Sequence, residues 1–214
     1  MSGTALKIIA LILMTADHIG DYIPDMPLWL RWIGRLSSPL FFFCAAEGAV
    51  HTSDRRRYLK RLWQASAALA MLEAVLPAVL SMYFRITLYD FDNNIFLSIF
   101  QGVLIISILE STKNDSRKRT KYLLCYGGYQ FILAVLSYTV EVNDPIMAAG
   151  IDINLIPILR DWDSIVFTLL GSLWHSEGPA VLTASIVLFY FCRENKKRLA
   201  VWYSAYCALY FLIF

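Results

Sequence analysis

The chain has 214 residues, of which 58% are hydrophobic and 17% charged, and its formal net charge is +2. A soluble domain of this length needs more charge than that to cover its surface, so the composition excludes one and predicts an integral membrane protein. No feature of the sequence indicates nucleic-acid binding.

Long, unbroken apolar stretches determine the predicted fold class. Backbone polar groups in a bilayer must be satisfied within the protein, so spanning segments are helices or closed barrels. Strands of a barrel would read as short alternating segments, and we therefore predict helices. The first apolar stretch contains charged residues and lacks a small-residue cleavage pattern, so we expect no cleaved signal peptide. We predict one all-α transmembrane domain over 1–214, with seven spans at about 6–24, 28–50, 58–84, 94–110, 122–140, 179–193 and 199–214.

Basic residues predict the orientation of these spans. Fifteen of the nineteen lysines and arginines lie at one set of span ends, which places those ends and the N-terminus in the cytoplasm. A further apolar stretch, 165–174, is too short to cross comfortably. If it crossed, the basic cluster at 193–198 would lie outside, so we predict a re-entrant or interfacial segment. The fifteen residues are Lys7, Arg55, Arg56, Arg57, Lys60, Arg61, Lys113, Arg117, Lys118, Arg119, Lys121, Arg193, Lys196, Lys197 and Arg198.

Ionisable side chains inside the predicted spans point to function. A charged side chain near a helix centre costs about 2.5–3.5 kcal/mol on insertion scales, so each one invites a functional explanation. At about 1.5 Å of rise per residue, one polar residue from each of the first four spans falls roughly 9–16 Å below the outer end of its span. These four residues, which define an expected polar layer, are His18, Arg35, Glu73 and Gln101.

Chemistry within this layer is predicted to centre on His18. A histidine exchanges a proton near neutral pH without heavy tuning, so an imidazole in a dry, charged pocket suits a general base. Asp21 follows three residues later on the same helical face and could orient the ring, while an Asp17–Arg35 ion pair would neutralise two buried charges. The alternative is that His18 only hydrogen-bonds between helices and the ion pairs only fix helix register. The surrounding polar residues favour function.

Motifs in the first half of the chain resemble the TraX family, named for a pilin acetylation protein of conjugative plasmids. The resemblance covers residues 6–110 well and is thin from 111 onward. It rests on Leu6-Lys7-Ile8-Ile9-Ala10, Met14, Asp17-His18-Ile19-Gly20, Arg31-Trp32-Ile33-Gly34-Arg35-Leu36, Pro39-Leu40-Phe41, Glu47-Gly48, Thr52, Tyr58-Leu59, Arg61-Leu62, Asn94-Ile95-Phe96-Leu97-Ser98 and Gln101-Gly102.

The resemblance implies a bacterial inner-membrane acetyltransferase within the wider group of transmembrane acyltransferases, which includes the lysosomal heparan acetyltransferase. Acetyl-coenzyme A would be the cytoplasmic donor and an amine, in the type case a pilin N-terminus, the acceptor on the outer side. His18 would be the base, with Asp17, Asp21 and Arg35 as further catalytic residues. The implied substrate-binding residues are Arg31, Glu47, Glu73, Asn94 and Gln101, with Arg35, Asn94 or Gln101 donating to the oxyanion, and the implied phosphate ligands are Arg57, Lys60 and Arg61.

Other readings stay open at this point. The same machinery could O-acetylate a glycan or lipid, and if the outer connection 141–178 lines the acceptor entrance, its divergence implies an acceptor other than pilin. From other classes, a small transporter or a non-catalytic membrane subunit would also hold intramembrane charges. Coenzyme A binding separates these classes, because a ligand of the native state stabilises it. The four cysteines show no metal-ligand spacing, so we expect no disulfide and no metal.

Overall fold

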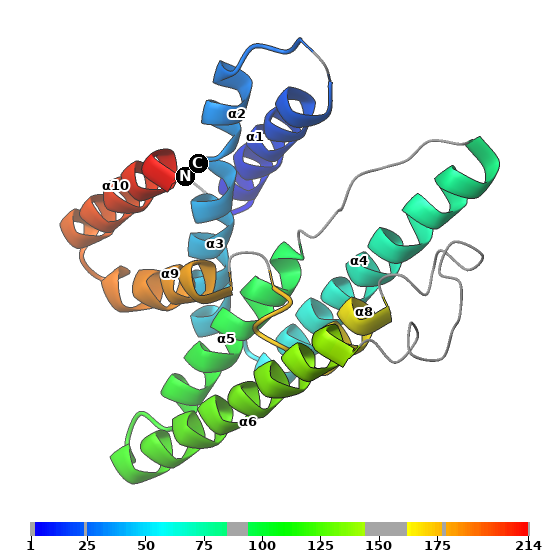
Figure 1. The fold of residues 1–214 in the computed structure, drawn as a ribbon. Coiled ribbons are helices and arrows are strands. Elements are labelled where there is room, and N and C mark those ends of the chain that lie inside the picture. The colour runs from blue at the N-terminus through cyan, green and yellow to red at the C-terminus, as the bar shows by residue number, and fades with distance from the viewer. Residues whose placement is uncertain (1–2, 24, 85–93, 144–161, 177–178, 214) are drawn as a thin grey trace. The chain divides into compact units, whose positions relative to one another are not determined.

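The structure is a computed structural model that describes residues 3–23, 25–84, 94–143, 162–176 and 179–213. Every regular element among these residues is an α-helix, as predicted (Figure 1). In chain order the helices are α1 (Gly3–Tyr22), α2 (Trp29–Gly34), α3 (Ser37–His51), α4 (Arg55–Phe84), α5 (Ile95–Ser111), α6 (Ser116–Asn143), α8 (Trp162–Leu169), α9 (Pro179–Cys192) and α10 (Lys196–Ile213).

The chain forms two compact units. Unit 1 comprises Met1–Ser53 and Ala184–Phe214, and unit 2 comprises Asp54–Thr183. In unit 1, α1 packs against both α2 and α3; in unit 2, α4 packs against α5 and α8, and α6 contacts the same two helices (Figure 1). The expected polar layer draws two residues from each unit, so that layer stays a prediction.

The second predicted span, 28–50, is broken into two helices. Pro39 has no N–H to donate to the carbonyl of Arg35 four residues earlier, and its ring crowds that carbonyl. The helix therefore cannot continue regularly through Arg35 and Leu36. Instead the N–H of Leu36 donates to the carbonyl of Ile33 at 3.2 Å, a tighter turn, before α3 begins.

Capping side chains start α4, α6 and α10 several residues earlier than hydropathy predicts. A carboxylate oxygen of Asp54 accepts from the N–H of Arg57 at 2.9 Å, and Asp115 accepts from Lys118 at 3.0 Å. Asn195 does the same before α10. The basic residues therefore lie in the first turns of these helices rather than in loops. The positive end of the helix dipole opposes cations there, so helix stability does not account for their position.

Within the part of the chain that the structure describes, two helices are long and apolar enough to cross a membrane, Gly3–Gly20 and Ser116–Asn143. Two further apolar helices there are shorter, Ile95–Ser111 and Val181–Cys192. Only 6% and 11% of the two long segments are buried. The core helix of a soluble protein is mostly buried, so this low burial favours a membrane protein. The seven-span arrangement stays a prediction.

The stretch predicted to re-enter, 165–174, forms α8 and the turn after it. Eight residues rise about 12 Å, less than half of the roughly 30 Å hydrocarbon core, so α8 is too short to span it. Gly171 adopts φ +70° and ends the helix. Its N–H donates to Thr168 at 2.9 Å and the N–H of Ser172 donates to Phe167 at 2.8 Å, which together form a Schellman motif.

Candidate functional site

In unit 1, two glycines allow the backbones of α1 and α2 to come into close contact. A Cβ added to Gly34 would lie 2.5 Å from the Cα of Asp17 and 2.6 Å from its backbone nitrogen. A Cβ on Gly20 would lie 2.9 Å from the Cγ of Arg31. The contact therefore needs glycine at both places. It sets Asp17 against the residue that precedes Arg35.

Four of the predicted site residues lie at or next to this contact, and they differ in how exposed they are. The side chains of Asp17, Arg31 and Arg35 are half-buried, whereas His18 is exposed. The exposed histidine is accessible to a ligand, and the three charged residues are partly shielded from solvent. The Asp17–Arg35 ion pair and the orienting role of Asp21 stay predictions, and the side chain of Asp21 lies outside the described part.

Glu47, also in unit 1, interacts with a neighbour on its own helix. Its carboxylate lies 3.4 Å from Nδ1 of His51, and the two side chains are 34% and 72% exposed. His51 is thus exposed. Substrate binding by Glu47 stays a prediction.

In unit 2, the two predicted amide side chains of α5 bridge helices. Asn94 is buried at the start of α5, where its Oδ1 accepts from the N–H of Leu97 at 3.1 Å and its Nδ2 donates to the carbonyl of Ser66 at 3.0 Å. Gln101 is fully buried and donates to the carbonyl of Gly171. These bonds give both amides a structural role, and their part in oxyanion binding stays a prediction. Glu73 is half-buried on α4.

The turn after α8 is held by side chains from α4 and α6, in addition to Gln101 of α5. Trp63 on α4 donates to the carbonyl of Leu169 at 3.0 Å, and Tyr129 on α6 donates to that of Leu170 at 2.6 Å. Gln130 donates to Gly171 at 3.0 Å and accepts from the N–H of Leu173 at 2.8 Å. The carbonyls that the Schellman motif leaves open are thereby satisfied by protein donors.

Sequence reasoning missed these donors. Gln130 lies inside the predicted fifth span, so the intramembrane polar signal used for Gln101 could have found it. Tyr126, whose hydroxyl donates to Oε1 of Gln101 at 2.9 Å, and the other aromatic donors carry no such signal, because aromatic residues are ordinary in spans.

His175 lies beside the same turn and is half-buried. Its ring stacks on Phe167 with centroids 4.8 Å apart. Its two ring nitrogens lie 3.4 Å from the hydroxyl of Ser172 and 3.5 Å from that of Ser137. This arrangement fixes the imidazole between α6 and the turn.

The predicted phosphate ligands lie at the start of α4. Arg57 is 70% exposed and its guanidinium lies 3.5 Å from the carboxylate of Asp54. Lys60 and Arg61 are exposed. Arg55 is instead directed to Glu110 at the end of α5, at 3.4 Å. Coenzyme A binding by the first three residues stays a prediction.

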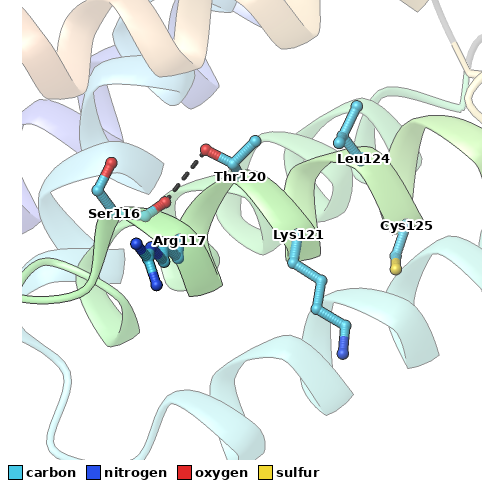
Figure 2. A pocket seen from close by; sticks show the side chains of 6 residues that line it. All are labelled: Ser116, Arg117, Thr120, Lys121, Leu124 and Cys125. Atoms are coloured by element: carbon cyan, nitrogen blue, oxygen red, sulfur yellow. Dashed lines mark hydrogen bonds between the residues drawn. The ribbon is translucent and has the colours of Figure 1, made fainter.

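A second basic surface of unit 2 is hollowed. A hollow of about 510 Å³ lies along the first turns of α6, and Figure 2 shows the side chains that line it. They are Ser116, Arg117, Thr120, Lys121, Leu124 and Cys125. Nothing in the sequence distinguished this hollow from the other basic stretches. Among the residues that the structure describes, no three or more His, Cys, Asp or Glu side chains form a group that could hold a metal ion.

Comparisons with known proteins place the chain in a family. The family model described as TraX protein matches residues 2–156. Over 65 residues the chain is 38% identical to the probable fimbrial assembly protein FimC, serogroup H1, of Dichelobacter nodosus; that alignment covers 28% of this chain and 27% of that protein. The chain thus matches about a quarter of that relative's length. No solved structure matches the chain. The family match covers well over half of the sequence, including the α1–α2 contact, and the chain therefore belongs to the TraX protein family.

Proposed function

We propose that this protein is a multi-pass membrane acetyltransferase that moves an acetyl group from cytoplasmic acetyl-coenzyme A to an amine at the outer face of a bacterial inner membrane. The family match over 2–156 is the observation that carries the proposal, because it covers α1 and α2 and the residues at their contact. The apolar, mostly exposed α1 and α6 support the membrane location.

The acceptor in this proposal is the N-terminal amine of a pilus subunit. The family is named for pilin acetylation, and the matched relative is named as a fimbrial assembly protein. Only 27% of that relative is matched, so its name alone does not identify the acceptor. The proposal therefore rests on the family name and the name of the relative together. Most of the outer connection that would meet the acceptor, residues 144–161 and 177–178, lies outside the described residues.

His18 acts as the general base in the proposed mechanism. Its exposed imidazole takes a proton from the acceptor amine as the nitrogen attacks the thioester carbonyl. The tetrahedral intermediate collapses, the carbon–sulfur bond breaks, and the coenzyme A thiolate leaves with the proton that His18 held. Asp17 and Asp21 favour the protonated imidazole, and Arg35 stabilises the oxyanion. The sheltered position of Asp17 against Gly34 supports this, because a partly buried carboxylate acts on its neighbour with little screening.

The other predicted residues bind the two substrates. Arg31, Glu47 and Glu73 take part in substrate binding, and Asn94 and Gln101 add hydrogen-bond donors near the reacting carbonyl. Arg57, Lys60 and Arg61 hold the phosphates of coenzyme A from the cytoplasmic side. Their exposure supports this, since exposed cations are accessible to a soluble nucleotide.

The proposal is tested with full-length protein purified in detergent, acetyl-coenzyme A and a peptide with a pilin-like free N-terminus. Release of coenzyme A thiol and the mass of the peptide are measured for wild type, His18→Ala and His51→Ala at equal folded yield. We expect His18→Ala to lose roughly 10²–10⁴-fold in rate, the usual contribution of a general base. His51→Ala is the comparison variant: it removes an exposed histidine that is not a proposed base but lies 3.4 Å from Glu47, so kcat should stay unchanged.

Three other outcomes would overturn all or part of the proposal. Full activity in His18→Ala would show that His18 is not the general base. Release of coenzyme A thiol with a glycan or lipid acceptor, and none with the peptide, would show that the acceptor group is a hydroxyl and not an amine. No transfer, together with no thermal stabilisation by coenzyme A, would remove the enzyme and favour a transporter or a non-catalytic subunit.

A further inference from the structure

The hollow on α6 is lined by two adjacent rows of one helix (Figure 2). Arg117, Lys121 and Cys125 form one row at four-residue spacing, and Ser116, Thr120 and Leu124 form the other. The hollow is therefore cationic and hydroxyl-bearing at the start of the helix and apolar one turn further on.

The two basic side chains of this hollow differ from their neighbours in having no partner within the described residues. Lys118 lies 3.4 Å from the carboxylate of Asp115, and Arg119 lies 3.5 Å from the hydroxyl of Ser116. Among the residues that the structure describes, the side chains of Arg117 and Lys121 form no hydrogen bond or ion pair. Two adjacent, unneutralised cations at the positive end of a long helix favour an anion between them.

An exposed apolar row continues along α6 from the hollow. Leu124 and Phe131 are 70% and 71% exposed, and between them a Cβ added to Gly128 would meet no atom within 4 Å. From Lys121 to Phe131 the helix rises about 15 Å, roughly the thickness of one leaflet's hydrocarbon. A ligand that fits this surface has an anionic head and an apolar chain of about that length.

We propose that this surface binds one anionic phospholipid of the cytoplasmic leaflet. Its phosphate lies between Arg117 and Lys121 and accepts a hydrogen bond from the hydroxyl of Ser116, and one acyl chain lies along Leu124, Gly128 and Phe131. The hydroxyl of Thr120 donates to the carbonyl of Ser116 at 3.1 Å and is not available to the phosphate (Figure 2). The proposal shares the membrane location proposed above but does not depend on acetyl transfer. Charge complementarity selects an anionic lipid, and the apolar row selects a lipid over a soluble phosphate.

Full-length protein in a neutral detergent is titrated with phosphatidylglycerol, and its thermal unfolding midpoint is followed. Phosphatidylcholine with the same acyl chains and 3′,5′-adenosine diphosphate are the comparison ligands. We expect phosphatidylglycerol, and not phosphatidylcholine, to raise the midpoint through Arg117 and Lys121. Any stabilisation by 3′,5′-adenosine diphosphate should come from the proposed phosphate ligands on α4 and should not depend on Arg117 or Lys121. In Arg117→Gln/Lys121→Gln the apparent affinity for phosphatidylglycerol should fall roughly thirty-fold, about 2 kcal/mol, since a cation near an anionic lipid surface contributes about 1 kcal/mol.

Lys118→Gln/Arg119→Gln is the matched control. It removes the same charge from the same turns. Its side chains do not line the hollow, although Arg119 contacts Ser116, so the affinity should change by less than about three-fold, as exposed pairs contribute little. The single variants Arg117→Gln and Lys121→Gln should each lose roughly five-fold, which keeps the test usable if the double variant fails to fold. Equal losses in both double variants would indicate a diffuse basic surface and overturn the proposal. Stabilisation by 3′,5′-adenosine diphosphate that needs Arg117 and Lys121 would overturn it in favour of a nucleotide.

Discussion

Gly34 shows how much one absent methyl group determines in unit 1. The residue is buried in α2, and the backbone of Asp17 occupies the space that a side chain would need. Backbone atoms cannot rotate away as the end of a flexible side chain can. The glycine therefore fixes the distance between α1 and α2, and with it the positions of Asp17 and His18.

Gly34→Ala is accordingly expected to destabilise the protein by about 1–3 kcal/mol, the usual range for overpacking, and to reduce acetyl transfer. Gly127→Ala is the matched control. An added Cβ there meets nothing within 4 Å, so alanine should raise stability by roughly 0.5–1 kcal/mol through its better helix propensity. Thermal unfolding midpoints in one detergent measure both. A lower midpoint for Gly127→Ala, or an unchanged one for Gly34→Ala, would contradict the close helix contact.

At the scale of the element, the turn after α8 depends on a relay of hydrogen bonds. Tyr126 donates to Gln101, and Gln101 donates to Gly171. Tyr126→Phe is expected to cost about 1–2 kcal/mol of unfolding free energy, because the buried oxygen of Gln101 loses its donor. Tyr138→Phe makes the same change at a residue that is 67% exposed on the same helix and should have little effect. Equal unfolding free energies of the two variants would show that the relay contributes nothing.

Basic residues at the start of α4 provide a second prediction at this scale. Replacing Arg57, Lys60 and Arg61 by glutamine is expected to raise KM for acetyl-coenzyme A roughly ten-fold with kcat unchanged, since exposed contacts to phosphate act equally on ground and transition states. Glutamines at 196–198 remove the same number of charges from another predicted cytoplasmic end, and steady-state kinetics should show no change. A loss in kcat, or equal losses in both variants, would argue against the phosphate role.

Hydropathy and charge predicted the helices, but the details of their ends came from short-range chemistry that these signals ignore. The break at Arg35 was readable from Pro39, and the early start of α6 from Asp115, because proline and capping residues act within four positions. The anchoring of α8 was not readable. Trp63 and Leu169 are 106 residues apart, and no local pattern predicts which aromatic side chain meets which carbonyl. The α1–α2 contact was partly predictable, because the sequence shows the two glycines but does not show which residues they contact.

At the scale of the whole molecule, the orientation of the chain depends on whether α8 crosses the membrane. Its eight residues and its anchored, non-helical exit fit a segment that enters and returns on one side. If it crossed, the basic residues at 193–198 would lie on the outer face, against the bias that orients membrane proteins. Both flanks of α8 are therefore expected on the outer side.

Single cysteines test this expectation in a variant whose four native cysteines are replaced by alanine. Asp163→Cys marks the first turn of α8 and Trp174→Cys the segment after it, and Lys118→Cys, on the exposed start of α6, marks the predicted cytoplasmic side. A membrane-impermeant maleimide is added to intact spheroplasts and again after permeabilisation, and labelling is measured. Both α8 positions should react in intact spheroplasts, and the α6 position only after permeabilisation. Protection of one α8 flank would show that the segment crosses, and the span count, the side of the basic ends after it and the proposed entrance for the acceptor would then all have to change.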